Sequence, residues 1–259
     1  MLRFSANISV LFRELPLLER FAAARAAGFG AVEIQVPYEA PAAALVAAAT
    51  ASGLRVVLIN APLGPEPGAP GMACRPEHRA IFRSELQRAA EYAHALGAPC
   101  VNVLAGRAAP QEHTACLQQL QEHLCLAAEV LAPVGARALL EAVNPLDAPD
   151  YCVPSFELAA EVLGRCAGRV WLQFDVYHAA RLGLEPETLF KRLLPQIAHV
   201  QFADFPGRHE PGTGGLPFPR IFRTIDASDY GGWVGAEYHP LASTRESLGW
   251  LEVSAHRQG

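Results

Sequence analysis

The stretch GWVGAEYH, residues 232–239, combines strand-forming residues with one carboxylate, Glu237. Its aromatic and β-branched residues favour a β-strand, and the glycines before them mark where it begins. An ionised carboxylate in an apolar segment is costly unless a cation or hydrogen-bond donors compensate it. A polar residue recurs in the same setting in ALLEAVN (Glu141), VWLQFDVYH (Asp175) and IAHVQFAD (Gln201). One explanation should cover all four segments.

Strand-like and helix-like segments alternate along the whole chain. The segments expected to be strands are 2–9, 31–36, 55–61, 100–106, 137–144, 170–178, 199–204 and 232–239. Helical patterns occupy 15–30, 41–53, 78–97, 113–135, 154–166, 185–197, 218–230 and 243–255. Such alternation predicts an α/β fold with a parallel sheet and right-handed crossovers. Eight units of about 32 residues fit a (β/α)8 TIM barrel better than a doubly wound sheet, which stays the alternative.

The composition predicts a single domain over residues 1–259 that does not bind nucleic acid or membranes. The chain is 51% hydrophobic and 18% charged, and no Pro/Gly/Ser-rich linker divides it. Its net charge is −5 without a basic run, whereas phosphate binding needs dense Lys and Arg. No apolar run reaches the roughly 18 residues of a membrane span. Six scattered cysteines without an export signal indicate packing roles in a reducing cytoplasm rather than a zinc site. The oligomeric state is left open, a homo-oligomer included.

Strand parity gathers the polar residues of the quoted segments at one end of the barrel. Side chains alternate between the two faces of a strand, and Glu141, Asp175, Gln201 and Glu237 all lie near the C-terminal ends of their strands. That end is where TIM barrels carry their active sites. Carboxylates brought together there would repel each other unless a cation joins them. Three carboxylates and one amide oxygen suit Mg²⁺ or Mn²⁺ better than zinc.

The other four strands place polar residues at comparable positions. These are Asn7, Glu33, Asn60 and Asn102, which we take as candidate substrate-binding residues. An amide at a strand end often only holds a neighbouring loop, and Glu33 has the alternative of pairing with an arginine. Nevertheless, a polar residue on every strand is hard to explain by stability alone.

Several motifs together resemble the hydroxypyruvate isomerase family, in the xylose-isomerase-like group of TIM barrels. The segments that carry the resemblance are MLRFSANISVLF, LLEAVN, QFDVYH, QFADFPGRHEPGTG and DYGGWVGAEYHP. Their order and spacing match the family across nearly the full length. Enzymes that isomerise or epimerise short keto-sugars and sugar acids share most of these features, so the group is better defined than the subfamily.

The resemblance implies a reaction and a set of residues. Hydroxypyruvate would interconvert with 2-hydroxy-3-oxopropanoate, with Glu141 and Glu237 as the acid/base pair and also, with Asp175 and Gln201, as the divalent-metal site. His178 and Arg208 would hold substrate oxygens. The chain departs from the family pattern at FPGR, residues 205–208, and at Gly215. These departures affect substrate specificity rather than reaction type.

The chemistry is consistent with these residue types. Moving a carbonyl to the adjacent carbon requires carboxylates tuned toward neutrality and support for an enediolate oxygen. An arginine would clamp a substrate carboxylate with paired hydrogen bonds. The loop 210–215 has the glycines of a lid or a surface turn. Alternative functions are a 2-oxo-tetronate isomerase, a keto-sugar 3-epimerase, a sugar-acid dehydratase, a non-catalytic sugar-acid binding barrel and, least of all, a metal-dependent abasic-site endonuclease.

Overall fold

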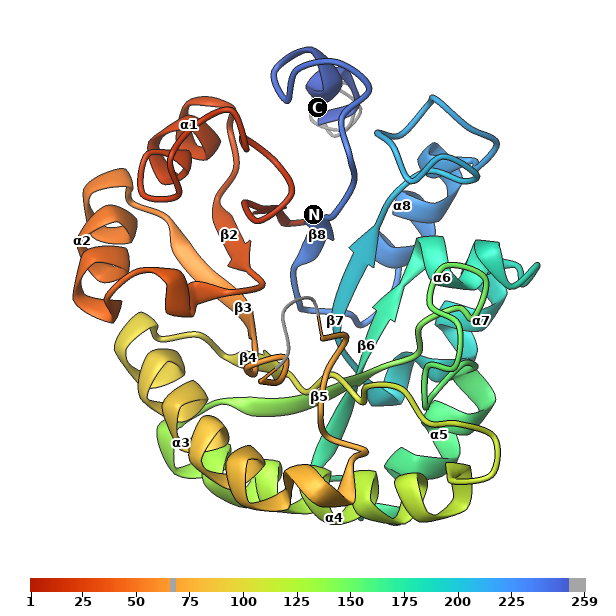
Figure 1. The fold of residues 1–259 in the computed structure, drawn as a ribbon. Coiled ribbons are helices and arrows are strands. Elements are labelled where there is room, and N and C mark those ends of the chain that lie inside the picture. Colours follow the sequence, from red (N-terminus) through yellow and green to blue (C-terminus); the bar gives the residue numbers. More distant parts are fainter. Residues whose placement is uncertain (66–68, 252–259) are drawn as a thin grey trace.

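The chain forms a closed barrel of eight parallel strands in a computed structural model that describes residues 1–65 and 69–251. The strands follow each other in chain order, and β1 pairs with β8 to close the ring (Figure 1). They are β1 (Phe4–Asn7), β2 (Ala31–Ile34), β3 (Arg55–Asn60), β4 (Cys100–Asn102), β5 (Arg137–Glu141), β6 (Val170–Asp175), β7 (Ile197–Phe202) and β8 (Val234–Ala236). The predicted TIM barrel is confirmed, and its closure excludes the doubly wound alternative.

Helices surround the barrel as an outer layer (Figure 1). They are α1 (Arg20–Ala26), α2 (Ala42–Ser52), α3 (Arg79–Leu96), α4 (His113–Leu131), α5 (Phe156–Arg165), α6 (Val176–Arg181), α7 (Pro186–Leu193) and α8 (Phe218–Asp226). Short 3₁₀ helices cover Pro37–Glu39, Pro76–His78, Ala132–Val134, Leu194–Gln196 and Glu246–Leu248. The expected last helix, 243–255, extends into residues 252–259, which lie outside the described residues. Within the described ranges, no helix has the combined length and apolarity that a membrane span requires.

Local sequence signals explain several helix ends. The Ser155 hydroxyl accepts a hydrogen bond from the backbone N–H of Leu158 at 3.2 Å and so caps the start of α5. Gly53 (φ 66°) and Gly97 (φ 62°) end α2 and α3 in the left-handed conformation that glycine adopts without steric cost. Capping residues and C-terminal glycines of this kind are visible in the sequence, so these helix ends could be predicted.

The strands face two different cores. One set of apolar strand residues, such as Val32, Phe174 and Phe202, packs outward against the helices in the main core. The opposite faces point into the barrel, where Leu58, Cys100 and Leu139 form a small separate cluster with the half-buried Trp171 and Ala198. This cluster fills the barrel interior toward the N-terminal ends of the strands. Parity then leaves the polar residues of the same faces toward the C-terminal ends.

The structure corrects several predicted boundaries. The predicted strand 170–178 ends at Asp175, and the unexpected short helix α6 begins directly afterwards. Asp175 causes this change, because its Oδ1 accepts the backbone N–H of Tyr177 at 2.8 Å and caps the new helix. Other strands are also shorter than predicted: the predicted strand 2–9 is a strand only over Phe4–Asn7, and 232–239 only over Val234–Ala236. The predicted helix 15–30 is helical only from Arg20 to Ala26.

Candidate active site

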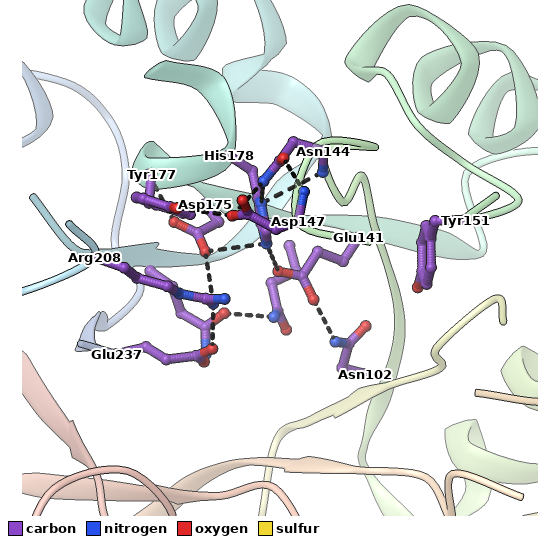
Figure 2. Close-up of polar contacts among 12 residues, drawn as sticks. Asn102, Glu141, Asn144, Asp147, Tyr151, Asp175, Tyr177, His178, Arg208 and Glu237 are labelled. Carbon is purple, nitrogen blue, oxygen red and sulfur yellow. Dashed lines mark hydrogen bonds and ion pairs between the residues drawn. The ribbon is translucent and has the colours of Figure 1, made fainter. Parts of the chain in front are cut away.

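The four residues predicted as the metal-binding quartet lie together at the C-terminal mouth of the barrel. Glu141 and Asp175 end β5 and β6, Gln201 is the next-to-last residue of β7, and Glu237 directly follows β8. The strand register aligns Asp175 with Gln201. All four are buried, with exposures of 7% or less. Figure 2 shows Glu141, Asp175 and Glu237 pointing into a common space.

Arg208 provides the positive charge of this space. It comes from the loop between β7 and α8, and its Nη2 lies 2.8 Å from Glu237 Oε1 and 3.7 Å from Asp175 Oδ2 (Figure 2). Its guanidinium carbon lies 5.1 Å from the centre of the Tyr177 ring. Burial opposes the charge of Arg208, but the neighbouring carboxylates raise its pKa above the ordinary value. Arg208 was predicted as a substrate clamp; here it also pairs with the carboxylates.

The two carboxyl groups of the predicted acid/base pair are poorly stabilised as anions. Burial raises the pKa of Glu141 well above its ordinary value, and the charges of Glu237 and Asp175 raise it further. Burial also raises the pKa of Glu237, to about 7, although Arg208 and the Asn7 hydrogen bond lower it. A carboxyl group in this range can accept or release a proton near neutral pH.

His178 faces the same space from α6. Its Nε2 lies 3.6 Å from Asp175 Oδ2 and 3.8 Å from Glu141 Oε1, beyond hydrogen-bond distance of either. Burial lowers the pKa of His178 to about 4, so the ring is neutral. One ligand atom each from Glu141, Asp175 and His178 lie within 4.8 Å of one another, and this triad could hold a metal ion.

The chemistry of these groups fits a divalent cation. Asp175 Oδ2 is buried and has no hydrogen-bond partner among the described residues, although buried carboxylate oxygens are normally paired. Together with Glu141 and Glu237 it forms a set of hard oxygen donors with excess negative charge, which suits Mg²⁺ or Mn²⁺. The position of Gln201 is less direct: its Nε2 donates to Glu237 Oε2 at 2.5 Å, and its Oε1 accepts from Gln173 at 2.5 Å. Gln201 would need to rotate its amide to present oxygen to a cation.

Glu33 lies beneath the mouth rather than in it. It is fully buried, and its carboxylate accepts hydrogen bonds from Ser5 (2.6 Å) and Gln201 (2.7 Å) and contacts His199 Nε2 at 2.9 Å. Gly235 leaves room for this carboxylate, since a Cβ there would clash with Glu33 Oε1. The structure therefore joins Glu33 to Glu237 through Gln201 instead of exposing it to a ligand.

Two of the three predicted asparagines contact the carboxylates of the mouth. Asn7 Nδ2 donates to Glu237 Oε2 at 2.9 Å, and Asn102 Nδ2 donates to Glu141 Oε2 at 3.0 Å. Asn60 is aligned with Asn102 in the register of β3 and β4 and is also buried. Two of the three thus orient the predicted acid/base pair.

Sequence reasoning missed Asp204, which organises the loop that carries Arg208. The Asp204 carboxylate accepts backbone N–H groups from four residues of this loop: Phe205, Gly212, Gly214 and Leu216. The predicted lid 210–215 is therefore held in a defined turn in this structure. A carboxylate followed by a glycine-rich stretch was the available signal, because glycine N–H groups can closely surround an anion.

A second missed group stands behind His178. Asn144 contacts the His178 ring, and Asp147 accepts hydrogen bonds from Asn144 (3.1 Å), Tyr177 (2.7 Å) and Arg181 (3.1 Å). Burial would raise the pKa of Asp147, but these hydrogen bonds together lower it. In the sequence, the spacing of Asn144 and Asp147 is that of an ordinary turn and indicates no functional role. Only their contacts with α6 show that the two residues support a side chain of the mouth.

Comparison with known proteins agrees with this architecture. The xylose isomerase-like TIM barrel family matches residues 21–253. A 2-oxo-tetronate isomerase of Cupriavidus necator is 38% identical over 253 residues, covering 96% of this chain and 97% of the relative. A putative hydroxypyruvate isomerase of Mus musculus is 40% identical over 270 residues, covering 100% and 97%. The crystal structure of an AP endonuclease, family 2, from Brucella melitensis superposes with a TM-score of 0.94 at 34% identity, covering 98% and 99%.

These similarities extend over nearly the whole length of the chain and of each relative. They establish that the protein is an isomerase enzyme. The chain belongs to the xylose isomerase-like TIM barrel family.

Proposed function

We propose that the enzyme interconverts hydroxypyruvate and 2-hydroxy-3-oxopropanoate by moving a proton between adjacent carbons. The observation that carries the proposal is the pair of buried carboxyl groups, Glu141 and Glu237, whose pKa values are both raised at one mouth. A raised pKa suits a carboxyl group to proton transfer at carbon, and the pKa of Glu237, about 7, lies near neutrality. The names of the mouse and Cupriavidus relatives support a short 2-oxo acid as substrate.

The reaction divides into balanced proton transfers. One carboxylate removes a proton from C3 of hydroxypyruvate, and the electron pair of the C–H bond moves to give an enediolate between C2 and C3. The hydroxyl proton on the C3 oxygen passes to the C2 oxygen, which leaves the negative charge on the C3 oxygen, and the carbonyl at C3 forms as the double-bond electrons take up a proton at C2. The other carboxyl group delivers a proton to C2. Glu141 and Glu237 are the two carboxyl groups, and hydrogen bonds from Asn102 and Asn7 keep them oriented.

Arg208 and His178 would bind the polar ends of the substrate. In the described part of the chain, the Arg208 guanidinium meets the carboxylates through Nη2 and leaves its other nitrogens for a ligand. Its side chain is 25% exposed, so a substrate carboxylate can reach it from the mouth. His178 faces the space between Glu141 and Asp175, where a substrate oxygen would lie.

A divalent cation, Mg²⁺ or Mn²⁺, would be held by Glu141, Asp175 and Glu237, with Gln201 joining after rotation of its amide. When bound, such a cation supplies electrostatic stabilisation for negative charge that develops on neighbouring substrate oxygens. The structural observation that supports this assignment is that the buried Asp175 Oδ2 accepts no hydrogen bond from any described residue.

A proton NMR time course with hydroxypyruvate in D₂O, with and without Mg²⁺, tests the proposal. We expect signals of 2-hydroxy-3-oxopropanoate with solvent deuterium at C2. Matched incubations with a 2-oxo-tetronate define the preferred chain length, since the relatives divide between the two names. Conversion of the four-carbon acid alone would transfer the proposal to that substrate. Failure of the folded enzyme to convert either acid would refute the proposed function.

The endonuclease activity for which the Brucella protein is named is not the function favoured here. Cleavage of DNA needs a basic surface, whereas this chain has a net charge of −5. Its candidate metal triad, Glu141, Asp175 and His178, contains a single histidine.

A further inference from the structure

The buried residue Asn144 approaches the His178 ring with two hydrogen-bond donors. Its backbone N–H lies 3.4 Å from His178 Nδ1, and its side-chain Nδ2 lies 2.7 Å from the same atom. A backbone N–H can only donate, so Nδ1 must be the accepting nitrogen of a neutral ring. The proton of the ring is then on Nε2.

The orientation of the Asn144 amide is itself determined by its neighbours. Its Oδ1 accepts the backbone N–H of Asp147 at 2.9 Å, which leaves Nδ2 facing the His178 ring. Nδ2 also donates to Asp147 Oδ2 at 3.1 Å, and Tyr177 and Arg181 hold that carboxylate in place. The hydrogen bonds thus form a chain from Arg181 through Asp147 and Asn144 to the ring, and Figure 2 shows its part from Asp147 to His178.

We infer that Asn144 is a positioning residue that keeps His178 in the Nε2–H tautomer, so that His178 donates a hydrogen bond to substrate instead of binding a metal ion. The inference deepens the proposed function and rests on it only for the identity of the substrate oxygen. Metal binding through Nε2 needs the lone pair that this tautomer replaces with a proton. The Nε2–H group is left free to donate to a substrate oxygen. Glu141 Oε1 and Asp175 Oδ2 lie 3.8 and 3.6 Å from Nε2, too far to accept this proton themselves.

Long-range ¹H–¹⁵N NMR of the full chain labelled at histidine nitrogen tests the tautomer directly. His178 is assigned by loss of its signals in His178→Gln. We expect the Nε2–H pattern in the wild-type protein, and we expect it to persist when Mg²⁺ is added. An Nδ1–H pattern in either condition would overturn the inference, because Nε2 would then be free to bind the ion.

The substitution Asn144→Asp reverses the hydrogen bond without changing size. A carboxylate accepts from Nδ1, so we expect a proton on Nδ1 and a kcat about 100-fold lower, with KM less affected. In Asn144→Ala the backbone donor remains, so we expect the Nε2–H tautomer to be kept with a loss of about 10-fold. Asn60→Asp makes the same chemical change elsewhere at the mouth and should leave the His178 pattern unaltered.

Failure of this inference is distinguishable from failure of the proposed function. An unprotonated Nδ1 in a folded Asn144→Asp protein would overturn the positioning role, whatever the activity. Equal loss of kcat in the Asp and Ala variants would also overturn it, because a structural role alone predicts no difference. Absence of turnover with both 2-oxo acids would refute the substrate assignment, and the NMR pattern would still decide the tautomer.

Discussion

Two groups of buried carboxylates lie in successive layers of the barrel interior, and they differ in how they are partnered. In the lower layer, Glu33 is fully buried and is held by Ser5, His199 and Gln201. In the mouth, Glu141 and Asp175 are nearly as buried, but Asp175 Oδ2 has no hydrogen-bond partner among the described residues and lies 3.7 Å from Arg208 Nη2.

This difference in hydrogen-bond partners indicates which layer of the barrel carries the chemistry. A carboxylate surrounded by donors supports structure, because its charge is stabilised by the protein alone. In the mouth, burial and neighbouring carboxylates raise the pKa of Glu141, and Asp175 Oδ2 has no hydrogen-bond donor among the described residues. Those are the properties that a proton-transfer and cation site needs. Burial is therefore common to both layers, and the mouth differs in the Asp175 oxygen without a hydrogen bond and in the raised pKa values of Glu141 and Glu237.

The largest expected effect comes from Glu237→Gln in the mouth. The change keeps size and removes proton transfer, so we expect kcat to fall by about 10³-fold or more while the protein remains folded. Steady-state isomerase kinetics and circular dichroism measure the two properties. Glu91→Gln, on the exposed surface of α3, is the matched control and should retain full activity. Turnover of the Glu237 variant within tenfold of wild type would contradict the assignment of the mouth.

The next effect tests Arg208, the cation of the mouth. In metal-free protein, Arg208→Met leaves Glu237 and Asp175 without their positive partner, and we expect a loss of about 3 kcal/mol in the free energy of unfolding. Added Mg²⁺ should stabilise the variant more than the wild type, since the ion no longer competes with the guanidinium. Thermal and urea unfolding with EDTA or Mg²⁺ measure this difference.

The control for Arg208 is Arg79→Met, which breaks the exposed pair with Glu122. Exposed pairs contribute less than about 1 kcal/mol, so this variant should unfold nearly as the wild type does in both conditions. Equal behaviour of the two variants would mean that Arg208 is not the charge that balances the mouth.

A smaller effect is expected in the lower layer, where a substitution should lower stability more than activity. Glu33→Gln puts an amide N–H₂ where donors already point, and we expect about 1–3 kcal/mol of lost stability. Activity should fall far less than in Glu237→Gln, because Glu33 reaches the mouth only through Gln201. Urea unfolding and kinetics on the same samples compare the layers. An activity loss equal to that of Glu237→Gln would place Glu33 in the chemistry.

The smallest effect is expected at His123, a buried histidine away from the mouth, where burial should alter the pH dependence of stability and not the activity. His123 of α4 lies stacked on Phe82 with its Nδ1 2.8 Å from the Ala73 carbonyl oxygen, and burial lowers its pKa. Its neutral form therefore stabilises the fold above the unfolded pKa of about 6.5, and this contribution is lost as pH falls toward the folded pKa. Between pH 7 and 5 the free energy of unfolding of the wild type should therefore fall by more than that of His123→Asn. Urea unfolding at both pH values measures it, and identical losses would show that His123 does not titrate as inferred.

The barrel was predictable because its signals are local. Alternating strand and helix patterns, with glycine punctuation such as Gly53 and Gly97, required no knowledge of distant contacts. The prediction failed at the end of β6, where two local structures compete. The Asp175 side chain accepts the backbone N–H of Tyr177 and so caps the start of α6. The residues VYH that follow Asp175 have a strand-like pattern, which does not reveal this hydrogen bond.

The sequence by itself determined which residues reach the mouth. Parallel order brings Glu141, Asp175, Gln201 and Glu237 to one end of the barrel, because each lies at or near the C-terminal end of its strand and side chains two residues apart share a face. Only the tertiary structure decided what each polar atom meets there: Arg208 between carboxylates, Glu33 saturated below them, and Asn144 behind His178. Those pairings depend on strand register and loop conformation, which place atoms from distant parts of the chain to within tenths of an ångström, and no local pattern contains that information.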